Sequence, residues 1–333
     1  MSVLVNLFDP DYTPQRTTLS GHTTSVIACL QVEDNYVITG GCDKTIRVYN
    51  LVNKRFLLQL SGHDGEVWAL KYAHGGILVS GSTDRTVRVW DIKKGCCTHV
   101  FKGHNSTVRC LDIVEYKNIK YIVTGSRDNT LHVWKLPKES SVPDHGEEHD
   151  YPLVFHTPEE NPYFVGVLRG HTATVRTVSG HGNIAISGSY DNTLIVWDVA
   201  QMKSSPCAKI LGAMYTLRGH RALVGLLGLS DKFLVSASAD GSIRCWDANT
   251  YFLKHFFDHT QLNTITALHV SDEVLVSGSE GLLNIYDLNS GLLVRSDTLS
   301  GADNVWNVSF KDNTLVAAVE RDKRNLLEIL DFS

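Results

Sequence analysis

Short apolar strands alternate with turn segments rich in glycine and aspartate along almost the whole chain, and helical periodicity is nearly absent. One such unit reads as an apolar segment, then LVSGSTD at residues 78–84, then TVRVWD at residues 86–91. Apolar runs of this length, bounded by turn residues at even intervals, predict brief antiparallel strands. We therefore expect an all-β protein.

The unit recurs seven times, which makes the internal repeat the dominant feature of the sequence. Gly-His pairs or weaker counterparts open the units at Gly21, Gly62, Gly103, Gly170, Gly219, Asp258 and Gly301. The units close on an aromatic or apolar residue at Tyr49, Trp90, Trp134, Trp197, Trp246, Tyr286 and Leu330. A repeat of this kind predicts stacked or radially arranged units rather than a single globular core.

A turn aspartate also recurs, at Asp43, Asp84, Asp128, Asp191 and Asp240. Aspartate favours turns and accepts hydrogen bonds, so it can bind the histidine of the Gly-His pair, while a strand Ser or Thr links that histidine to the closing Trp. These features resemble WD repeats, and seven of them imply a seven-bladed β-propeller. In such rings Arg16–Leu19 should complete the last blade by pairing beside Leu326–Leu330.

The predicted organisation is an N-terminal linker at residues 1–15 followed by the propeller at residues 16–333. One interval is too long: residues 137–165 hold five of the eight prolines and seven acidic residues against Lys138. We interpret this stretch as an acidic, proline-rich surface loop. Its His145, His149 and His156 could suggest a metal cluster, but a solvated loop is the simpler interpretation.

Composition narrows the possible functions. The 31 Lys and Arg against 36 Asp and Glu give a formal charge of −5, which argues against general binding to nucleic acid or to an acidic membrane. The seven cysteines have no paired C-x-x-C spacing, so a reducing compartment is expected. No nucleophile elbow, P-loop or zinc-protease motif is present in the sequence. We expect no catalysis, no cofactor and no bound metal.

Aligning the units shows what each blade presents to the central channel. The residue after the first-strand Val or Ile is, in order, Ile27, Trp68, Arg109, Arg176, Gly225, Thr266 and Trp306. The turns around the recurring aspartate add Thr83, Arg85, Arg127 and Tyr190. Both sets should emerge on one face, so we expect four arginines, Arg85, Arg109, Arg127 and Arg176, to share one rim.

Four neighbouring guanidiniums repel one another and call for an anion with several acceptor oxygens, which a phosphate supplies. Trp68 and Trp306, with Thr83 and Thr107 nearby, would form an apolar slot for a proline or an aliphatic side chain. The pattern therefore predicts a phosphopeptide site. Pairing of single arginines with acids of neighbouring blades is the alternative interpretation.

The stretches around residues 62–140 and 187–203 resemble the WD-repeat propellers of the fungal cell-division-control F-box proteins, the substrate receptors of SCF ubiquitin ligases. The resemblance implies recognition of phosphothreonine followed by proline. It assigns Arg85, Arg127, Arg176 and Tyr190 to the phosphate, with Arg109 in support. It assigns Trp68, Thr83 and Thr107 to the proline pocket and Trp306 to the aliphatic one.

Two departures from that family stand out. No F-box precedes Gly21, so we expect no docking of the ligase adaptor by this chain. The family propeller has eight blades, whereas this chain passes from Gln201 to Cys207 where a whole repeat would be expected. The arginines all precede this junction and should keep their mutual arrangement.

The leading hypothesis is a nuclear, and also cytoplasmic, receptor that binds phosphothreonine-proline segments of cell-cycle regulators for ubiquitination. The alternative is a WD-repeat scaffold that binds proteins without phosphate. A third interpretation is a fragment of altered blade number that binds no ligand.

Overall fold

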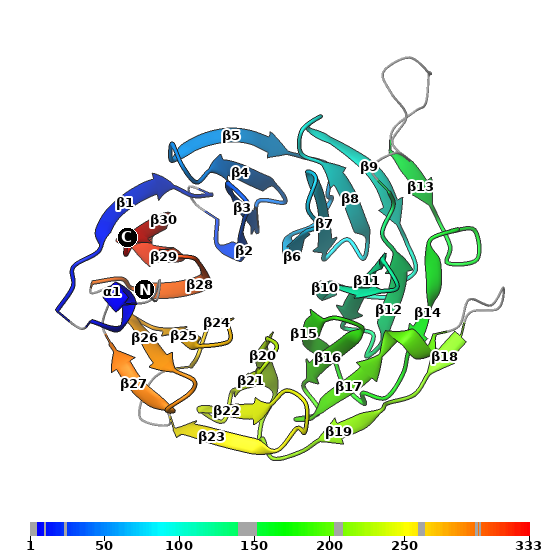
Figure 1. Cartoon of the computed structure of the whole chain (residues 1–333). Coiled ribbons are helices and arrows are strands. Elements are labelled where there is room, and N and C mark those ends of the chain that lie inside the picture. The colour runs from blue at the N-terminus through cyan, green and yellow to red at the C-terminus, as the bar shows by residue number, and fades with distance from the viewer. Residues whose placement is uncertain are drawn as a thin grey trace.

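Seven sheets of mainly antiparallel strands surround a central opening in the computed structural model (Figure 1). The structure describes residues 5–9, 11–22, 25–138, 152–202, 209–258, 264–296, 299 and 301–333. The innermost strand of each sheet borders the opening and the outermost lies at the circumference. The predicted all-β, seven-bladed propeller is therefore confirmed.

In each blade the strands follow one another from the channel outward. Blades 1 and 2 consist of β2 (Ile27–Glu33), β3 (Tyr36–Gly41), β4 (Ile46–Asn50) and β5 (Arg55–Leu60), then β6 (Val67–Tyr72), β7 (Ile77–Ser82), β8 (Val87–Asp91), β9 (Cys96–Phe101) and the added β13 (Leu153–Phe155). Blades 3 and 4 consist of β10 (Val108–Tyr116), β11 (Ile119–Ser126), β12 (Leu131–Lys135), β14 (Phe164–Leu168) and the added β18 (Lys209–Leu211), then β15 (Val175–His181), β16 (Ile184–Ser189), β17 (Leu194–Asp198) and β19 (Tyr215–Leu217). Blades 5 and 6 consist of β20 (Val224–Leu229), β21 (Phe233–Ser238), β22 (Ser242–Asp247) and β23 (Leu253–Asp258), then β24 (Ala267–Val270), β25 (Val274–Ser279), β26 (Leu282–Asp287) and β27 (Leu292–Arg295). Blade 7 consists of β28 (Asn304–Lys311), β29 (Thr314–Arg321), β30 (Arg324–Asp331) and β1 (Gln15–Ser20).

The ring closes by pairing the two ends of the chain. Strand β1 lies antiparallel to β30, with Arg16 opposite Leu330 and Leu19 opposite Leu327. This pairing confirms the closure predicted from the sequence. Because the outer strand comes from the N-terminal end, blade 7 cannot be completed without it, and an unpaired edge of β30 is avoided.

Hydrogen-bonded side chains tie the strands of single blades together as the repeat predicts. In blade 2, His63 Nδ1 lies 2.7 Å from Asp84 Oδ2 and its Nε2 lies 2.7 Å from Ser80 Oγ, which also accepts from Trp90 Nε1 at 2.8 Å. Blades 3, 4 and 5 repeat this arrangement around His104, His171 and His220. Because the histidine, the hydroxyl and the indole N–H of each network all have partners, the network fixes the turn that carries the aspartate.

The acidic, proline-rich stretch is not one surface loop. Residues 139–151, including His145 and His149, lie outside the described residues. Residues 152–165, in contrast, contribute β13, which adds to β9 in parallel, and the start of β14. Phe155 and Tyr163 pack on Phe101, with ring centroids 6.0 and 5.6 Å away. Aromatic burial thus overrides the loop-like composition of this segment.

The N-terminal residues predicted as a linker also pack on the propeller. Helix α1 (Val5–Phe8) buries Leu7 in the core shared by the last two blades. Asn6 Nδ2 donates to the carbonyl of Phe332 at 2.9 Å, and Tyr12 donates to the carbonyl of Ser333 at 2.8 Å. Burial of apolar side chains and these hydrogen bonds hold the segment against the ring.

Blade 4 receives its outer strand late in the chain. After β17 come the short helix η2 (Val199–Gln201), then β18 on the outer edge of blade 3, and only then β19. The predicted junction at residues 201–207 lies mostly outside the described residues. The chain beyond the junction therefore supplies the strand that completes blade 4. No helix in the described ranges is long and apolar enough to span a membrane.

Candidate functional site

A β-bulge near the start of the inner strand determines which side chains face the channel. The strand register shifts between Val67 and Ala69 in blade 2, and between the equivalent residues of blades 3, 4, 5 and 7. The extra residues at these bulges are Trp68, Arg109, Arg176, Gly225 and Trp306. A bulge turns its extra residue out of the ladder. All five line a central cavity of about 480 Å³.

Blade 1 differs from the sequence alignment by one residue. Its register shifts between Ile27 and Cys29, so the bulge residue is Ala28 and not the predicted Ile27. Ile27 instead pairs with Gly41 and is fully buried. Ile27 still lines the central cavity beside Ala28, but its predicted equivalence to the bulge residues was wrong, because strand pairing, and not the distance from the Gly-His pair, sets the position of the bulge.

The turns that carry the recurring aspartate reach the start of the inner strands, at one mouth of the channel. The backbone N–H groups of Thr83, Arg127 and Tyr190 donate to the carbonyls of Glu66, Thr107 and Thr174, each at 3.0 Å. This repeated hydrogen bond places Arg127 beside the strand that bears Arg109, and Tyr190 beside the strand that bears Arg176. The two predicted sets of residues therefore share one face.

Three arginines and one tyrosine form what we call the cationic rim: Arg109, Arg127, Arg176 and Tyr190. The guanidinium of Arg109 lies 3.6 Å from the ring centroid of Trp68. Burial, and then the positive charges of Arg176 and Arg127, lower the pKa of Arg109 to about 10. Burial also lowers the pKa of Arg176, and Tyr190 lies close enough to interact electrostatically with both groups.

The cationic rim has no acidic partner among the described residues: no ion pair there involves Arg109, Arg127 or Arg176. Arg127 is exposed, and Tyr190 is 48% exposed. Neighbouring like charges raise the free energy of the empty site, and an anion would offset that repulsion. The rim is thus chemically suited to a ligand with more than one negative charge.

The repeats themselves decide the family. The model described as WD domain, G-beta repeat, matches residues 13–50, 54–91, 95–135, 162–198 and 212–247, more than half of the chain. The chain belongs to the WD-repeat family. Each match ends at or next to the last residue of the third strand of a blade, which agrees with the blade boundaries of the structure.

Two fungal WD-repeat relatives match nearly all of the chain. Cell division control protein 4 of Saccharomyces cerevisiae is 68% identical over 99% of this chain and 49% of its own length. The protein of the same name from Candida albicans is 39% identical over 99% of this chain and 55% of its own length. The chain thus spans about half the length of these relatives. The resemblance predicted from the sequence is confirmed.

Two further comparisons concern the ring. The match to the Saccharomyces protein extends over 384 aligned residues, although this chain has 333, so the relative contains residues without a counterpart here. This agrees with the absence of one repeat of the family pattern. Among solved structures, the computationally designed Ika8 protein matches with a TM-score of 0.66 and 27% identity, covering 92% of this chain and 83% of its own.

Arg85 is not placed with the cationic rim of this WD-repeat chain. It lines a second cavity, of about 560 Å³, whose other walls come from the turns at Asp64 and Asp84, from β8 and β9, from residues 102–105 and from the segment between Pro152 and Glu159. Its backbone φ is +71°, a left-handed conformation that the turn requires. Equivalence in the repeat predicted its turn correctly, but its side chain borders a different cavity from the one that Arg109 and Arg176 line.

The residues predicted to form the apolar slot beside the phosphate differ in their surroundings. Trp68 and Trp306 line the central cavity from blades 2 and 7. Thr107 is 8% exposed, and Thr83 packs so closely on Gly65 that a Cβ there would meet its Oγ1 at 2.2 Å. Trp306 Nε1 donates to Asn325 Oδ1 at 3.1 Å, which fixes the plane of its ring.

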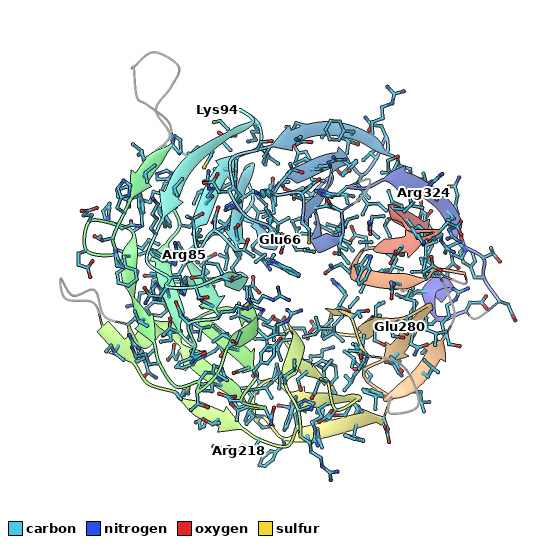
Figure 2. All side chains as sticks on the ribbon, turned by 180° about the vertical axis from the view of Figure 1, so that it is seen from behind. Glu66, Arg85, Lys94, Arg218, Glu280 and Arg324 are labelled. Atoms are coloured by element: carbon cyan, nitrogen blue, oxygen red, sulfur yellow. The ribbon has the colours of Figure 1, made fainter. Side chains whose placement is uncertain are left out.

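Glu66 was missed by the sequence argument. Its carboxylate accepts a hydrogen bond from Trp68 Nε1 at 3.0 Å, and it lies beside the central opening (Figure 2). The Cys42 thiol also bonds to Glu66, and this carboxylate contributes to raising the pKa of that thiol, after burial. Strand alternation offered no signal for it, because Glu66 precedes β6 and Trp68 is the extra residue of a bulge.

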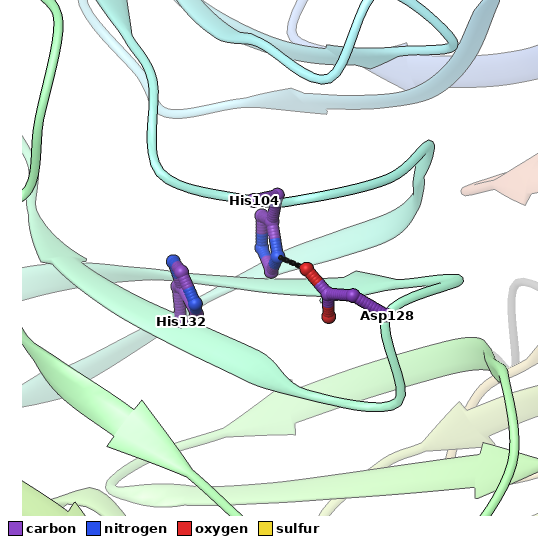
Figure 3. A group of neighbouring side chains, drawn as sticks. All are labelled: His104, Asp128 and His132. Carbon is purple, nitrogen blue, oxygen red and sulfur yellow. Dashed lines mark hydrogen bonds and ion pairs between the residues drawn. The ribbon is translucent and has the colours of Figure 1, made fainter.

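A cluster of two histidines and an aspartate in blade 3 has the composition of a metal site (Figure 3). His104 and His132 stack with ring centroids 3.8 Å apart. Both ring nitrogens of His104 already have partners, however: Asp128 at 2.9 Å and Thr124 at 2.8 Å. His104 and Asp128 therefore serve the hydrogen-bonded network of the WD repeat, and His132 packs against it by stacking on His104.

Proposed function

We propose that this propeller binds a phosphothreonine-proline segment of a protein ligand across the mouth of its central channel. The observation that carries the proposal is the cationic rim, whose three arginines have no acidic partner among the described residues. A phosphate carries nearly two negative charges and three acceptor oxygens, so it can bind several guanidiniums at once. A single carboxylate can satisfy fewer of them.

The geometry supports a division of roles that differs in part from the sequence assignment. Arg109 takes a central place, because it stacks on Trp68 and its pKa responds to Arg176 and Arg127. Arg127 and Tyr190 extend from the turns toward the same mouth. Arg85 is left as an outer contact, since it lines the second cavity.

The residue that follows the phosphothreonine would pack on the indole of Trp68, between the side chains of Thr83 and Thr107. The indole Nε1 donates a hydrogen bond to Glu66, which fixes the ring plane and preorganises its face for a flat proline ring. Trp306 lines the same cavity from blade 7 and would contact aliphatic residues that precede the phosphothreonine. Phosphate and apolar contacts would thus be recognised together.

For the whole protein we propose substrate recognition in an SCF-type ubiquitin ligase, acting on phosphorylated cell-cycle regulators in the nucleus. This part rests on the similarity to Cell division control protein 4 and on the receptor family that the sequence resembles. In that family an F-box, and not the propeller, contacts the adaptor. The propeller alone would therefore bind substrate without transferring ubiquitin.

Fluorescence polarisation with paired Leu-Leu-Pro-Thr-Pro peptides, phosphorylated and unphosphorylated, tests the proposal. We expect binding of the phosphorylated peptide near micromolar Kd, about −8 kcal/mol, and much weaker binding of its twin. Arg176→Gln should weaken only the phosphorylated peptide. Arg218→Gln, which changes an arginine away from the central opening, is the matched control (Figure 2). Equal binding of both peptides would favour a phosphate-independent scaffold instead.

A further inference from the structure

A Thr-Pro sequence of the chain itself borders the second cavity. Thr157 and Pro158 line this space of about 560 Å³ together with Arg85, Arg88 and Lys102. The cavity lies between blades 2 and 3, and it shares none of its lining residues with the central one. A hydroxyl, a following proline and three cations are therefore gathered at one place outside the proposed peptide site.

The three cations have no acidic partner in the part of the chain that the structure describes, since no ion pair there involves Arg85, Arg88 or Lys102. The Nε of Arg88 is buried without a hydrogen-bond partner among the described residues, although Arg88 does bond to the Cys97 thiol. The Nζ of Lys102 lies 3.3 Å from His156 Nδ1, a neighbour that carries no negative charge. The cations are thus available to an added anion.

The carboxylates of the cavity do not neutralise these groups. Asp84 is held by His63 at 2.7 Å and by the hydroxyl of Thr86 at 2.7 Å. The other two, Asp64 and Glu159, are exposed to solvent. A new anion would lie close to these three acids, so it must gain more from the cations than it loses by repulsion.

The Thr157 segment is held in place but keeps its hydroxyl within reach. Pro158 packs over Gly103, where a Cβ would lie 3.0 Å from the proline Cγ. Among the described residues, the one bond that the Thr157 hydroxyl accepts is long, 3.4 Å, and comes from the backbone N–H of Glu160. Thr157 is partly exposed. The hydroxyl can therefore be modified without breaking a strong interaction.

We propose that Thr157 is a phosphorylation site for a proline-directed protein kinase, and that its phosphate binds to Arg85, Arg88 and Lys102 in the second cavity. In the transfer, the Thr157 Oγ attacks the γ-phosphorus of ATP and the bond to ADP breaks. The hydroxyl proton passes to the base of the kinase. The product adds nearly two negative charges opposite three cations, the arrangement in which a phosphate orders a segment.

The modification would also reach the proposed peptide site, a consequence that rests on the proposed function. Arg85 follows Thr83 in the same turn, and Thr83 belongs to the predicted proline pocket. A phosphate bound by Arg85 would repel acidic residues or a second phosphate of the ligand at that edge. We therefore expect the phosphorylated chain to bind such acidic peptides several-fold more weakly.

The first test is modification of the folded chain. Incubation with ATP and either a cyclin-dependent or a MAP kinase should place phosphate on Thr157, located by mass spectrometry and lost in Thr157→Ala. Thr13, which also precedes a proline and is exposed, serves as the internal comparison. Modification of Thr13 with none at Thr157 would overturn the proposal.

The second test asks where the phosphate lies. In a ³¹P NMR titration, the cations should lower the second pKa of phosphothreonine 157 by roughly half a unit or more from that of a free phosphopeptide of the same sequence. Arg85→Gln and Lys102→Gln should each reduce the shift. Lys94→Gln, in the β8–β9 turn and not among the residues that line the second cavity, should not reduce it (Figure 2). A pKa equal to that of the free peptide would contradict the proposal.

Neither test involves peptide binding, so each still decides whether Thr157 is phosphorylated and where its phosphate binds if the proposed function is wrong. Size-exclusion chromatography of the phosphorylated chain completes them. A monomer is expected if the phosphate binds within its own chain. A phosphorylation-dependent dimer, abolished by Arg176→Gln, would mean that the segment binds the channel of a second copy, and this would overturn the intramolecular site.

Discussion

At the scale of single residues, several turn residues with a side chain have the strained left-handed backbone conformation. Arg85 has φ +71° and Lys44, at the same turn position in blade 1, has φ +69°. The equivalent residues in blades 3 and 4 are Asn129 and Asn192, and asparagine tolerates this conformation best among residues with a side chain. An arginine or a lysine at such a position is more strained than an asparagine would be.

Arg85→Asn should therefore stabilise the propeller, by about 0.5–1 kcal/mol, while removing a cation from the second cavity. Urea unfolding at neutral pH measures the first effect. Lys44→Asn is the matched control and should give a similar gain. A loss of stability in Arg85→Asn alone would show that its guanidinium contributes to the fold.

The histidine–aspartate pairs make stability depend on pH. Burial alone would raise the pKa of Asp240, but hydrogen bonds from Ser242 and from the backbone N–H of Arg221 outweigh it and lower the pKa to about 2. Burial lowers the pKa of His220, which opposes its protonation in the folded state. In both cases the unfolded chain binds protons more readily, so stability rises with pH.

We accordingly expect the free energy of unfolding to fall from pH 6.5 downward, as the unfolded histidines become charged, and to fall more steeply between pH 4 and 2. Denaturant unfolding across this range measures the slope. Asp240→Asn should be less stable at pH 7 and should show a shallower slope below pH 4. An unchanged slope would contradict the role given to the pair.

Single residues also show how far sequence reasoning reaches into the site. Trp68, Arg109 and Arg176 could be placed in the channel because the repeat gives each the same distance from its Gly-His pair, and Trp306 because it directly follows the first-strand Val305. The bulge residue of blade 1, Ala28, could not, because the shifted register of that blade decides its position. Glu66 was missed because its role depends on contacts with Trp68 and with the Cys42 thiol that no repeat records.

At the scale of elements, blade 7 is held by charges instead of by the histidine network. The carboxylate of Glu328 is 1% exposed and lies 2.5 Å from Arg16 on β1 and 2.5 Å from Arg321 on β29. Arg16 comes from β1, the strand that closes the ring. Removing the Arg16 guanidinium would leave the buried Glu328 carboxylate with one of its two ion pairs.

Arg16→Gln should destabilise the protein by about 1–3 kcal/mol and should speed hydrogen exchange in β30. Arg55→Gln, an exposed arginine on the outer strand of blade 1, should change neither. Hydrogen exchange followed by mass spectrometry separates β30 from β22 of blade 5, which should stay protected in both variants. Equal protection of β30 in Arg16→Gln would show that the pairing of β1 needs no ion pair.

Elements also mark the limit of composition as a guide. Residues 152–165 have the proline and acid content of a loop, yet β13 adds to blade 2 and the following turn borders the second cavity. Parallel addition of a short strand depends on a free blade edge and on Phe155 and Tyr163 meeting Phe101. Neither condition can be seen from the local sequence.

At the scale of the whole molecule, the repeat predicted the ring, its seven blades and its closure, because the strand and turn pattern recurs in every unit even where the histidine network does not. The sequence could not predict how blade 4 is completed. Strand β19, from beyond the junction, takes the outer position there, so the ring closes with seven blades and an intact edge. The three arginines of the cationic rim precede the junction and lie in adjacent blades.

The central claim is that these arginines recognise a phosphate, and a thermodynamic cycle tests it most directly. Binding of the phosphorylated and unphosphorylated peptide is measured for the wild-type chain and for Arg127→Gln. We predict a coupling free energy between the phosphate and Arg127 of about 1.5–3 kcal/mol, the value of a charged hydrogen bond. A coupling near zero, with both chains folded, would contradict recognition of phosphate at the rim.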